Sequence, residues 1–184
     1  MFRIYSLILI QLASIFLIAS CAQKESTLEL SANEYGIVVI ENVPFVKQKD
    51  KFCGPAAMAS VMQFYDQNID QDEIAQEVYI PELNGALISE MENFARGNGY
   101  TTEATNGDIE SLKSTIDDQL PVILLVDKGK WKVSVPHYYV AYGYNDEKRV
   151  ILLHTGFKSE QEISFDKLDS EWKKMNRLML VIKK

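Results

Sequence analysis

The most informative stretch of the chain is Val43-Pro-Phe-Val-Lys-Gln-Lys-Asp-Lys-Phe-Cys-Gly-Pro-Ala-Ala57. From Cys53 to Tyr65 nearly every residue is apolar, and Pro55 stands close to the start of this run. Proline is tolerated in the first turn of a helix, so we expect a helix that begins at about Cys53. Because it is apolar on most of its faces, this helix should be buried at the centre of the domain.

Cys53 therefore stands at the amino terminus of a predicted helix. The helix dipole and the free backbone N–H groups at such a position favour the thiolate over the thiol, which makes a cysteine reactive. The other cysteine of the chain, Cys21, is expected to serve a different purpose, which leaves Cys53 without a disulfide partner. We treat Cys53 as a candidate nucleophile, and the alternative is a small, buried apolar side chain.

Helix signals fill the first half of the chain and strand signals fill the second. Three further helices are predicted, with starts marked by Asp70, Asn84-Gly85 and Asp108, and the middle one should carry Leu87, Met91 and Phe94 on one face. Runs rich in β-forming residues follow at 122–126, 137–143, 150–154 and 178–182, with one short helix near 166–173. Helices followed by antiparallel strands are typical of an α+β fold.

The composition excludes several classes of function. The 184 residues include 26 acidic and 19 basic side chains, a formal net charge of −7. An acidic chain lacks the basic face that nucleic acid requires, so we expect no nucleic-acid partner. The length suits one compact domain, which we expect at residues 35–184. No motif indicates a nucleotide or another cofactor, and no close-spaced pair of metal ligands is present.

The start of the chain has the features of a targeting segment. Residues 1–20 carry one charge, Arg3, and an apolar stretch that ends in Leu17-Ile-Ala-Ser-Cys21. The stretch is shorter than the ~20 apolar residues of a spanning helix but fits a signal peptide. Its end resembles the bacterial lipoprotein signal, in which the cysteine is lipidated and becomes the first residue. We expect residues 1–20 to be removed, Cys21 to carry acyl chains such as palmitate, and residues 21–34 to form a polar tether.

This segment also predicts where the protein acts. A lipid-anchored domain would lie in the bacterial cell envelope outside the cytoplasm. Ala22 follows the cysteine where lipoproteins of the inner membrane often have Asp, so the outer membrane is expected if the source has two membranes. We expect a monomer that meets the membrane through its lipid.

Residues 43–57 resemble the active-site start of the bacteriocin-processing, double-glycine-type cysteine peptidases, a papain-like family with a glutamine five residues before Cys-Gly-Pro-Ala-Ala. Pro136-His-Tyr-Tyr-Val-Ala-Tyr-Gly-Tyr144 resembles the histidine strand of that family, and the resemblance extends over residues 41–183. It implies a papain-like α+β fold, in which a helical half with a buried nucleophile helix packs on a carboxy-terminal antiparallel sheet.

The resemblance also implies a role for each residue of the site. Cys53 would be the nucleophile, His137 its base and later its acid, and Gln48 the oxyanion donor. A thiolate–imidazolium pair can attack a carbonyl and return a proton to the leaving amine. The resemblance therefore implies a cysteine peptidase that cleaves a peptide or amide bond of a peptide or protein substrate without a cofactor or metal.

The third member of the site departs from the family pattern. The family usually has an acidic residue after the strand that follows the histidine strand, whereas this chain has Leu152-Leu-His-Thr-Gly156 there. Asp146 lies in the preceding hairpin turn, too far along the strand from His137 to replace it. If the turn pairs Tyr144 with residue 149, His154 becomes a diagonal neighbour of His137 on the same face. We hypothesise that His154 accepts a hydrogen bond from His137, or that the enzyme works as a Cys–His dyad.

Three alternatives remain open. Without the acidic residue, the domain could be a catalytically inactive papain-like module that binds a peptide or an envelope partner. Cys53, His137 and His154 could instead bind zinc. A cell-wall amidase or endopeptidase of another papain-like lineage would use the same chemistry on another substrate. Leader cleavage does not follow from the fold, because this sequence has no transporter segment and no ATP-binding motif and is expected to be a stand-alone lipoprotein.

Overall fold

The central helix begins at the residue that the sequence predicts. In the computed structural model, which describes residues 36–184, α2 (Cys53–Phe64) starts at Cys53 and buries nine consecutive residues, Gly54–Met62. Residues from Val38 onward form one compact unit. The predicted signal peptide, Cys21 and the tether at 21–34 lie outside the described residues. No helix within residues 36–184 is both long enough and apolar enough to cross a membrane.

Three helices follow α2, namely α3 (Gln71–Val78), α4 (Ile88–Gly97) and α5 (Ile109–Asp117). Of these, α3 and α5 begin where their capping signals predict, whereas α4 begins three residues after Gly85, at Ile88, without a side-chain cap. The Asp70 side chain accepts hydrogen bonds from the first turn of α3, and Asp108 forms a capping box with Ser111 at the start of α5. The expectation that Leu87 lies within this helix is wrong, because Leu87 precedes α4 as its N-cap residue and is 46% exposed.

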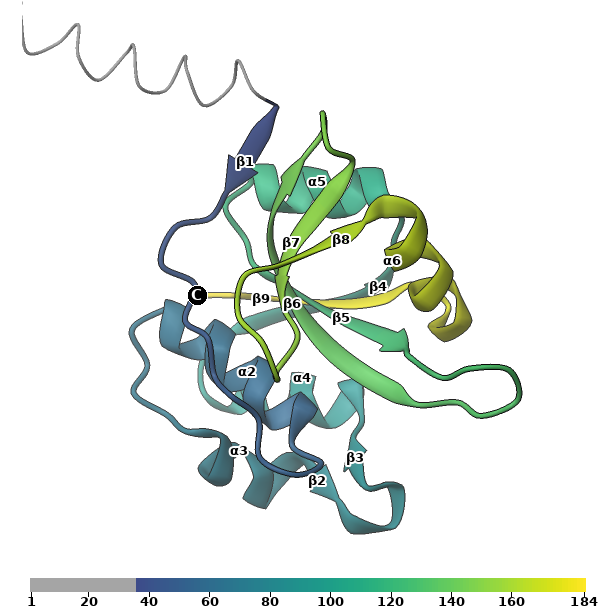
Figure 1. Ribbon diagram of the computed structural model, residues 1–184. Helices are drawn as coiled ribbons and strands as arrows, with labels where there is room; N and C mark the ends of the chain where they lie inside the picture. The colour runs from purple at the N-terminus through teal and green to yellow at the C-terminus, as the bar shows by residue number, and fades with distance from the viewer. Residues whose placement is uncertain (1–35) are drawn as a thin grey trace, which may run out of the picture. The chain divides into compact units, whose positions relative to one another are not determined.

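The second half of the chain forms most of a seven-stranded sheet with neighbouring strands in the order β4-β9-β5-β6-β7-β8 (Figure 1). Its strands are β1 (Ile37–Val39), β4 (Thr101–Asn106), β5 (Val122–Asp127), β6 (Pro136–Asn145), β7 (Val150–His154), β8 (Gln161–Ser164) and β9 (Leu178–Lys183). The pairs along this order are antiparallel, and β1 pairs with β6. Two short strands, β2 (Tyr79–Ile80) and β3 (Gly85–Ala86), pair with each other around the 3-10 turn η1 (Pro81–Leu83). The predicted α+β class is confirmed.

The two outermost strands of the sheet, β4 and β8, were not predicted. Both are largely polar, with the sequences TTEATN and QEIS, and lack the apolar alternation that marks a half-buried strand. Each lies at an edge of the sheet, where one side of the backbone is unpaired and polar residues are common. Only the tertiary pairing makes these segments strands.

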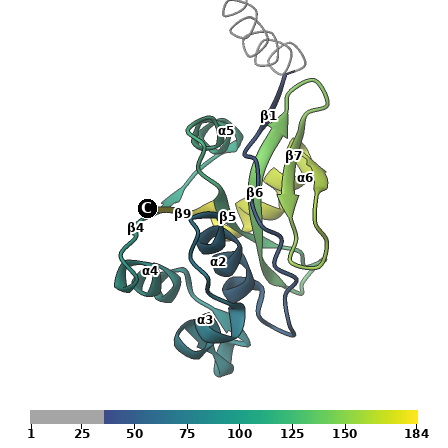
Figure 2. The same ribbon diagram turned by 90° about the vertical axis from the view of Figure 1, so that its left-hand side faces the viewer.

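The sheet separates two hydrophobic cores. Alternate residues of β5 face opposite sides, so Ile123 joins the core beneath α2, α3 and α4, and Leu124 joins the core beneath α5 and α6 (Phe165–Trp172). Figure 2 shows α2 and α6 on opposite sides of β6. As a result, the helix that carries Cys53 covers one face of the strand that carries His137.

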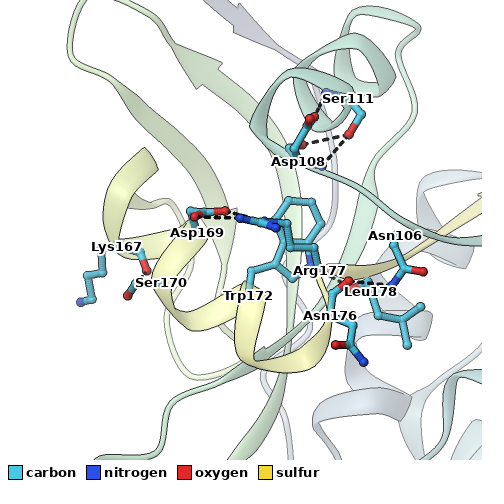
Figure 3. A network of polar contacts seen from close by, with 10 residues as sticks. All are labelled: Asn106, Asp108, Ser111, Lys167, Asp169, Ser170, Trp172, Asn176, Arg177 and Leu178. Carbon is cyan, nitrogen blue, oxygen red and sulfur yellow. Dashed lines mark hydrogen bonds and ion pairs between the residues drawn. The ribbon is translucent and has the colours of Figure 1, made fainter.

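A polar network joins α6 and the 3-10 turn η2 (Lys173–Met175) to β9 (Figure 3). Arg177 pairs with both carboxylate oxygens of Asp169 at 2.7 and 3.2 Å, and the indole N–H of Trp172 donates to Leu178 O at 2.9 Å. Trp172 is fully buried. These contacts hold the chain as it leaves the helix and enters the strand beside β5.

Candidate active site

Cys53 meets the backbone of β6 at the end of the strand where His137 lies. The backbone N–H groups of Tyr138 and Gly54 act on its sulfur and lower the pKa of the thiol, against the effect of burial. Gly54 allows this approach, because a Cβ at that position would lie 2.9 Å from Ala86 Cβ and 3.4 Å from the Tyr138 ring. The Tyr138 hydroxyl in turn donates to Ala86 O at 2.9 Å, which ties the β2–β3 hairpin to the same strand.

His137 is held by a backbone carbonyl and by aromatic rings. Its Nε2–H donates to Thr155 O at 2.7 Å. The imidazole stacks on Phe157, with ring centroids 5.5 Å apart and planes 7° from parallel, and meets Tyr139 edge-on at 5.4 Å. Because a carbonyl oxygen can only accept a hydrogen bond, the neutral ring carries its proton on Nε2 and its free lone pair on Nδ1. The Nδ1 atom is therefore the basic nitrogen of His137.

Gln48 is held against the turn that follows β7. Its backbone N–H donates to Gly156 O at 2.8 Å, and its side-chain Oε1 is buried without a hydrogen-bond partner among the described residues. A Cβ at Gly156 would overlap this Oε1, and Gly156 has a φ of +77°. Glycine is therefore required at residue 156 both for its backbone conformation and for the close approach of Gln48.

A buried glutamine on α3 fixes the chain on both sides of Gln48. Gln71 is 8% exposed, its Oε1 accepts from Lys49 N–H at 2.8 Å, and its Nε2 donates to Lys47 O at 2.8 Å. These two hydrogen bonds could not be predicted from the sequence, because Gln71 looks like an ordinary first residue of a helix. Only the packing of α3 against the loop that holds Gln48 brings the Gln71 side chain into contact with the backbone of that loop.

The three predicted residues thus converge on two short backbone segments. Cys53 contacts the first of them, His137–Tyr138 of β6, while His137 and Gln48 contact the second, Thr155–Gly156, directly after β7. The second segment occupies the place at which the sequence lacks the expected carboxylate. A backbone carbonyl acts there as the acceptor, and no sequence pattern could have identified it.

Burial keeps both reactive groups neutral. Burial raises the pKa of the Cys53 thiol, and hydrogen bonds from backbone N–H groups oppose this rise only in part. Burial also lowers the pKa of His137 to about 4, although its hydrogen bond to Thr155 acts in the opposite direction. Both groups are therefore neutral at rest, whereas the sequence predicts a thiolate–imidazolium pair.

The predicted contact between His154 and His137 is wrong. The hairpin pairs Asn145 with Val150, and a β-bulge between residues 141 and 143 then shifts the register so that His154 faces Val140. Residues 137 and 140 lie on opposite faces of β6, so the two imidazoles cannot meet. One inserted residue, Tyr142, causes the change of face.

The backbone occupies both ring nitrogens of His154. Nε2–H donates to Val43 O at 3.1 Å, and Nδ1 accepts from Glu160 N–H at 3.3 Å. His154 instead lines a cavity of about 10 Å³ with Cys53, which has room for about one water molecule. Within residues 36–184, no three His, Cys, Asp or Glu side chains lie close enough to hold a metal ion, so the zinc alternative has no ligand set there.

A larger hollow lies beside the His137 ring. It has a volume of about 400 Å³ and is lined by Thr155 and Phe157, which hold the ring, and by residues of β5–β6 and α6 that include Lys128, Tyr139 and Glu171. Lys128 lies over the rings of Tyr139 and Phe157, 5.6 Å from each centroid. This hollow shares Thr155 and Phe157 with the surroundings of the His137 ring.

Comparison with known proteins identifies the family and the fold. Residues 40–179 match the model of the Peptidase_C39 like family. A crystal structure of a C39-like peptidase from Bacillus anthracis superposes with a TM-score of 0.66 at 17% identity, covering 80% of this chain and 98% of the other. The peptidase domain of Streptococcus ComA, a bifunctional ABC transporter of a quorum-sensing pathway, superposes with a TM-score of 0.63 at 23% sequence identity. The match covers 81% of this chain and 98% of the other.

A third solved structure is a double glycine motif protease from an AMS/PCAT transporter in complex with the leader peptide. It gives a TM-score of 0.63 at 17% identity, with 80% of this chain and 97% of the other covered. At these identities the structural likeness shows a shared fold. Among curated proteins, none matches this chain.

Proposed function

Because the chain belongs to the peptidase C39-like family, we propose that it is a membrane-anchored cysteine peptidase that cleaves a peptide or amide bond outside the cytoplasm. The observation that carries this proposal is the convergence of Cys53, His137 and Gln48 on residues 137–138 and 155–156. These three residue types, which acyl transfer requires, come from distant parts of the chain, and each contacts one of these two segments.

In the proposed reaction the neutral imidazole acts as a general base. Nδ1 of His137 takes the proton of the Cys53 thiol as the sulfur attacks the substrate carbonyl, so the ion pair forms during the reaction. The Gln48 amide N–H₂ and the Cys53 backbone N–H stabilise the resulting oxyanion. The imidazolium then gives its proton to the leaving amine, and water, activated by the same imidazole, releases the acyl group from sulfur.

Thr155 O takes the orienting role that a carboxylate has in the family pattern. It fixes the ring so that Nδ1 remains the basic atom. A neutral carbonyl stabilises the imidazolium less than a carboxylate would, because hydrogen bonds between charged groups are stronger than those with a neutral partner. We therefore expect a functional Cys–His dyad with a lower acylation rate than a carboxylate-assisted site.

The anchor and the substrate class complete the proposal. Cys21 would carry the lipid, and residues 21–34 would tether the domain to the membrane. A peptide substrate is supported by the structural neighbour that was solved with a leader peptide. Leader cleavage itself is not part of the proposal, because that activity belongs to transporter-linked relatives and does not follow from a shared fold.

The direct test is cleavage of a peptide mixture by the full-length chain in detergent, followed by mass spectrometry. The Cys53→Ala protein is the matched control, because it removes only the sulfur from a half-buried position. Products that require Cys53 would support the peptidase. If the two proteins give the same products, the peptidase proposal is overturned.

The alternative function is a catalytically inactive papain-like module that binds a peptide or an envelope partner. The absence of a carboxylate beside His137 and the neutral state of the resting thiol favour it. A peptidyl thioester that acylates Cys53 distinguishes the two. A peptidase loses acylation in the His137→Ala variant, whereas a binding module shows the same slow acylation with and without His137.

A further inference from the structure

The connection between β5 and β6 exposes an aromatic side chain. Residues 128–135, called here the β5–β6 loop, project away from the ends of both strands in Figure 1. Trp131 is 98% exposed, and Val133 and Val135 are 67% and 47% exposed. Trp131 also has a φ of +59°, an uncommon and strained conformation for a bulky side chain. The loop thus holds a tryptophan out into solvent at an energetic cost.

The base of the loop is well braced. The buried Asp127 carboxylate accepts hydrogen bonds from the backbone N–H groups of Gly129 and Val135, at 2.7 and 2.8 Å, and from the Ser134 hydroxyl at 3.0 Å. Lys174 of η2 donates to Gly129 O at 3.0 Å. The exposed apolar side chains therefore stand on an ordered support.

The charge around the loop is opposite to that of the whole chain. Residues 128–135 contain three lysines and no acidic residue, although the chain has a net charge of −7. Lys132 lies 5.8 Å from the centroid of the Trp131 ring, and η2 adds Lys173 and Lys174 next to the loop. The nearby Asp127 carboxylate stays charged, because its hydrogen bonds lower its pKa, but it is buried at the base of the loop. The result is a local basic surface around an exposed tryptophan.

We propose that the β5–β6 loop docks on the surface of an anionic phospholipid bilayer. Trp131 and Val133 would enter the interfacial region, where amphipathic aromatic rings are preferred, while Lys130 and Lys132 would lie among the phosphates. The proposal uses the membrane anchor of the proposed function to bring the bilayer near, but it does not depend on peptidase activity.

Docking would fix the orientation of the active site. Val135, at the end of the loop, is two residues before His137, so a docked loop brings the start of β6 close to the bilayer surface. The acyl anchor alone would leave the domain free to turn on its tether. The substrate would then be a peptide segment that lies at or just above the membrane.

The two tryptophans of the chain provide the assay. Trp131 is almost fully exposed and Trp172 is fully buried, so quenching from outside reports on Trp131. The full-length chain is reconstituted into vesicles of phosphatidylcholine with phosphatidylglycerol, and flotation measures attachment separately from docking. We expect brominated lipids to quench Trp131 and aqueous acrylamide to lose access to it. The Trp131→Phe protein gives the signal of Trp172 alone.

The charge contribution is tested with a matched pair of variants. Lys130→Gln with Lys132→Gln should lower the ratio of docked to undocked loop about thirtyfold, at about 1 kcal/mol for each lysine near an anionic surface. Lys148→Gln with Lys183→Gln removes the same charge from exposed ion pairs elsewhere, in the turn between β6 and β7 and in β9, and should leave docking unchanged. Vesicles of phosphatidylcholine alone should reproduce the loss.

Two results would overturn the proposal. One is acrylamide quenching of Trp131 that stays the same in floated vesicles as in detergent, with no effect of brominated lipid. The other is protection of Trp131 by a substrate peptide in detergent without any protection by vesicles, which would assign the loop to substrate binding. Failure of the anchor would appear as loss of flotation, and failure of the peptidase would affect neither fluorescence result.

Discussion

Replacing Gly156 with alanine tests whether Gln48 acts as a positioned oxyanion donor. The new Cβ would overlap Gln48 Oε1 and lie 3.3 Å from its Cδ, so the side-chain amide must retreat by roughly 1 Å to restore van der Waals contact. A displacement of this size can cost about 10²-fold in rate, close to the effect of deleting one oxyanion donor. Alanine at positive φ adds about 1–2 kcal/mol of backbone strain.

Gly99→Ala is the matched control. Gly99 has a φ of +87°, but a Cβ there would have no neighbour within 4 Å, so this variant carries the strain without the clash. Both variants should lower the free energy of unfolding by about 1–2 kcal/mol, because Gln48 can yield at the end of its side chain without disturbing the fold. Only Gly156→Ala should slow the acylation of Cys53.

The assay combines urea unfolding with single-turnover acylation of Cys53 by a peptidyl thioester. In the double variant with Gln48→Ala, the rate losses should not add, because both substitutions remove the same interaction. An acylation rate of Gly156→Ala equal to that of Gly99→Ala would refute the assigned role of Gln48. Fully additive losses would refute the link between the two residues.

Three further predictions follow from the site and its surroundings. Gln71→Ala leaves Lys49 N–H and Lys47 O without their partner, so we expect a loss of about 1–3 kcal/mol in unfolding free energy and a slower acylation of Cys53. Gln71→Glu keeps the acceptor for Lys49 N–H but sets a second oxygen against Lys47 O, so its loss of stability should be smaller at low pH, where the protonated carboxyl can donate. The pKa of His137 falls from 6.5 to about 4 on folding, so the unfolded chain binds more protons between these values. The contribution of His137 to the free energy of unfolding is therefore fully present above pH 6.5 and falls by about 3 kcal/mol as the pH drops toward 4. Urea titrations at a series of pH values measure this fall, and it should be absent in the His137→Asn variant. Burial raises the pKa of Cys53, so alkylation by iodoacetamide should still be increasing above pH 9, and a plateau near neutral pH would contradict the neutral resting pair.

The sequence by itself determined the parts of this protein that depend on local chemistry. Proline in a first turn predicts the start of α2 at Cys53, and side chains that can cap a helix predict the starts of α3 and α5. Apolar runs predict the four central strands in the same way. The family motifs then pointed to Gln48, Cys53 and His137, whose contacts in the fold lie at residues 137–138 and 155–156.

Tertiary structure alone decided which groups surround these residues. A one-residue bulge at Tyr142 moves His154 to the opposite face of the sheet, because side chains alternate at every position of a strand. The acceptor for His137 is the Thr155 carbonyl, and every residue type carries such a group, so no sequence pattern marks it. The neutral state of Cys53 likewise depends on burial, which outweighs the helix dipole only once the sheet covers the thiol.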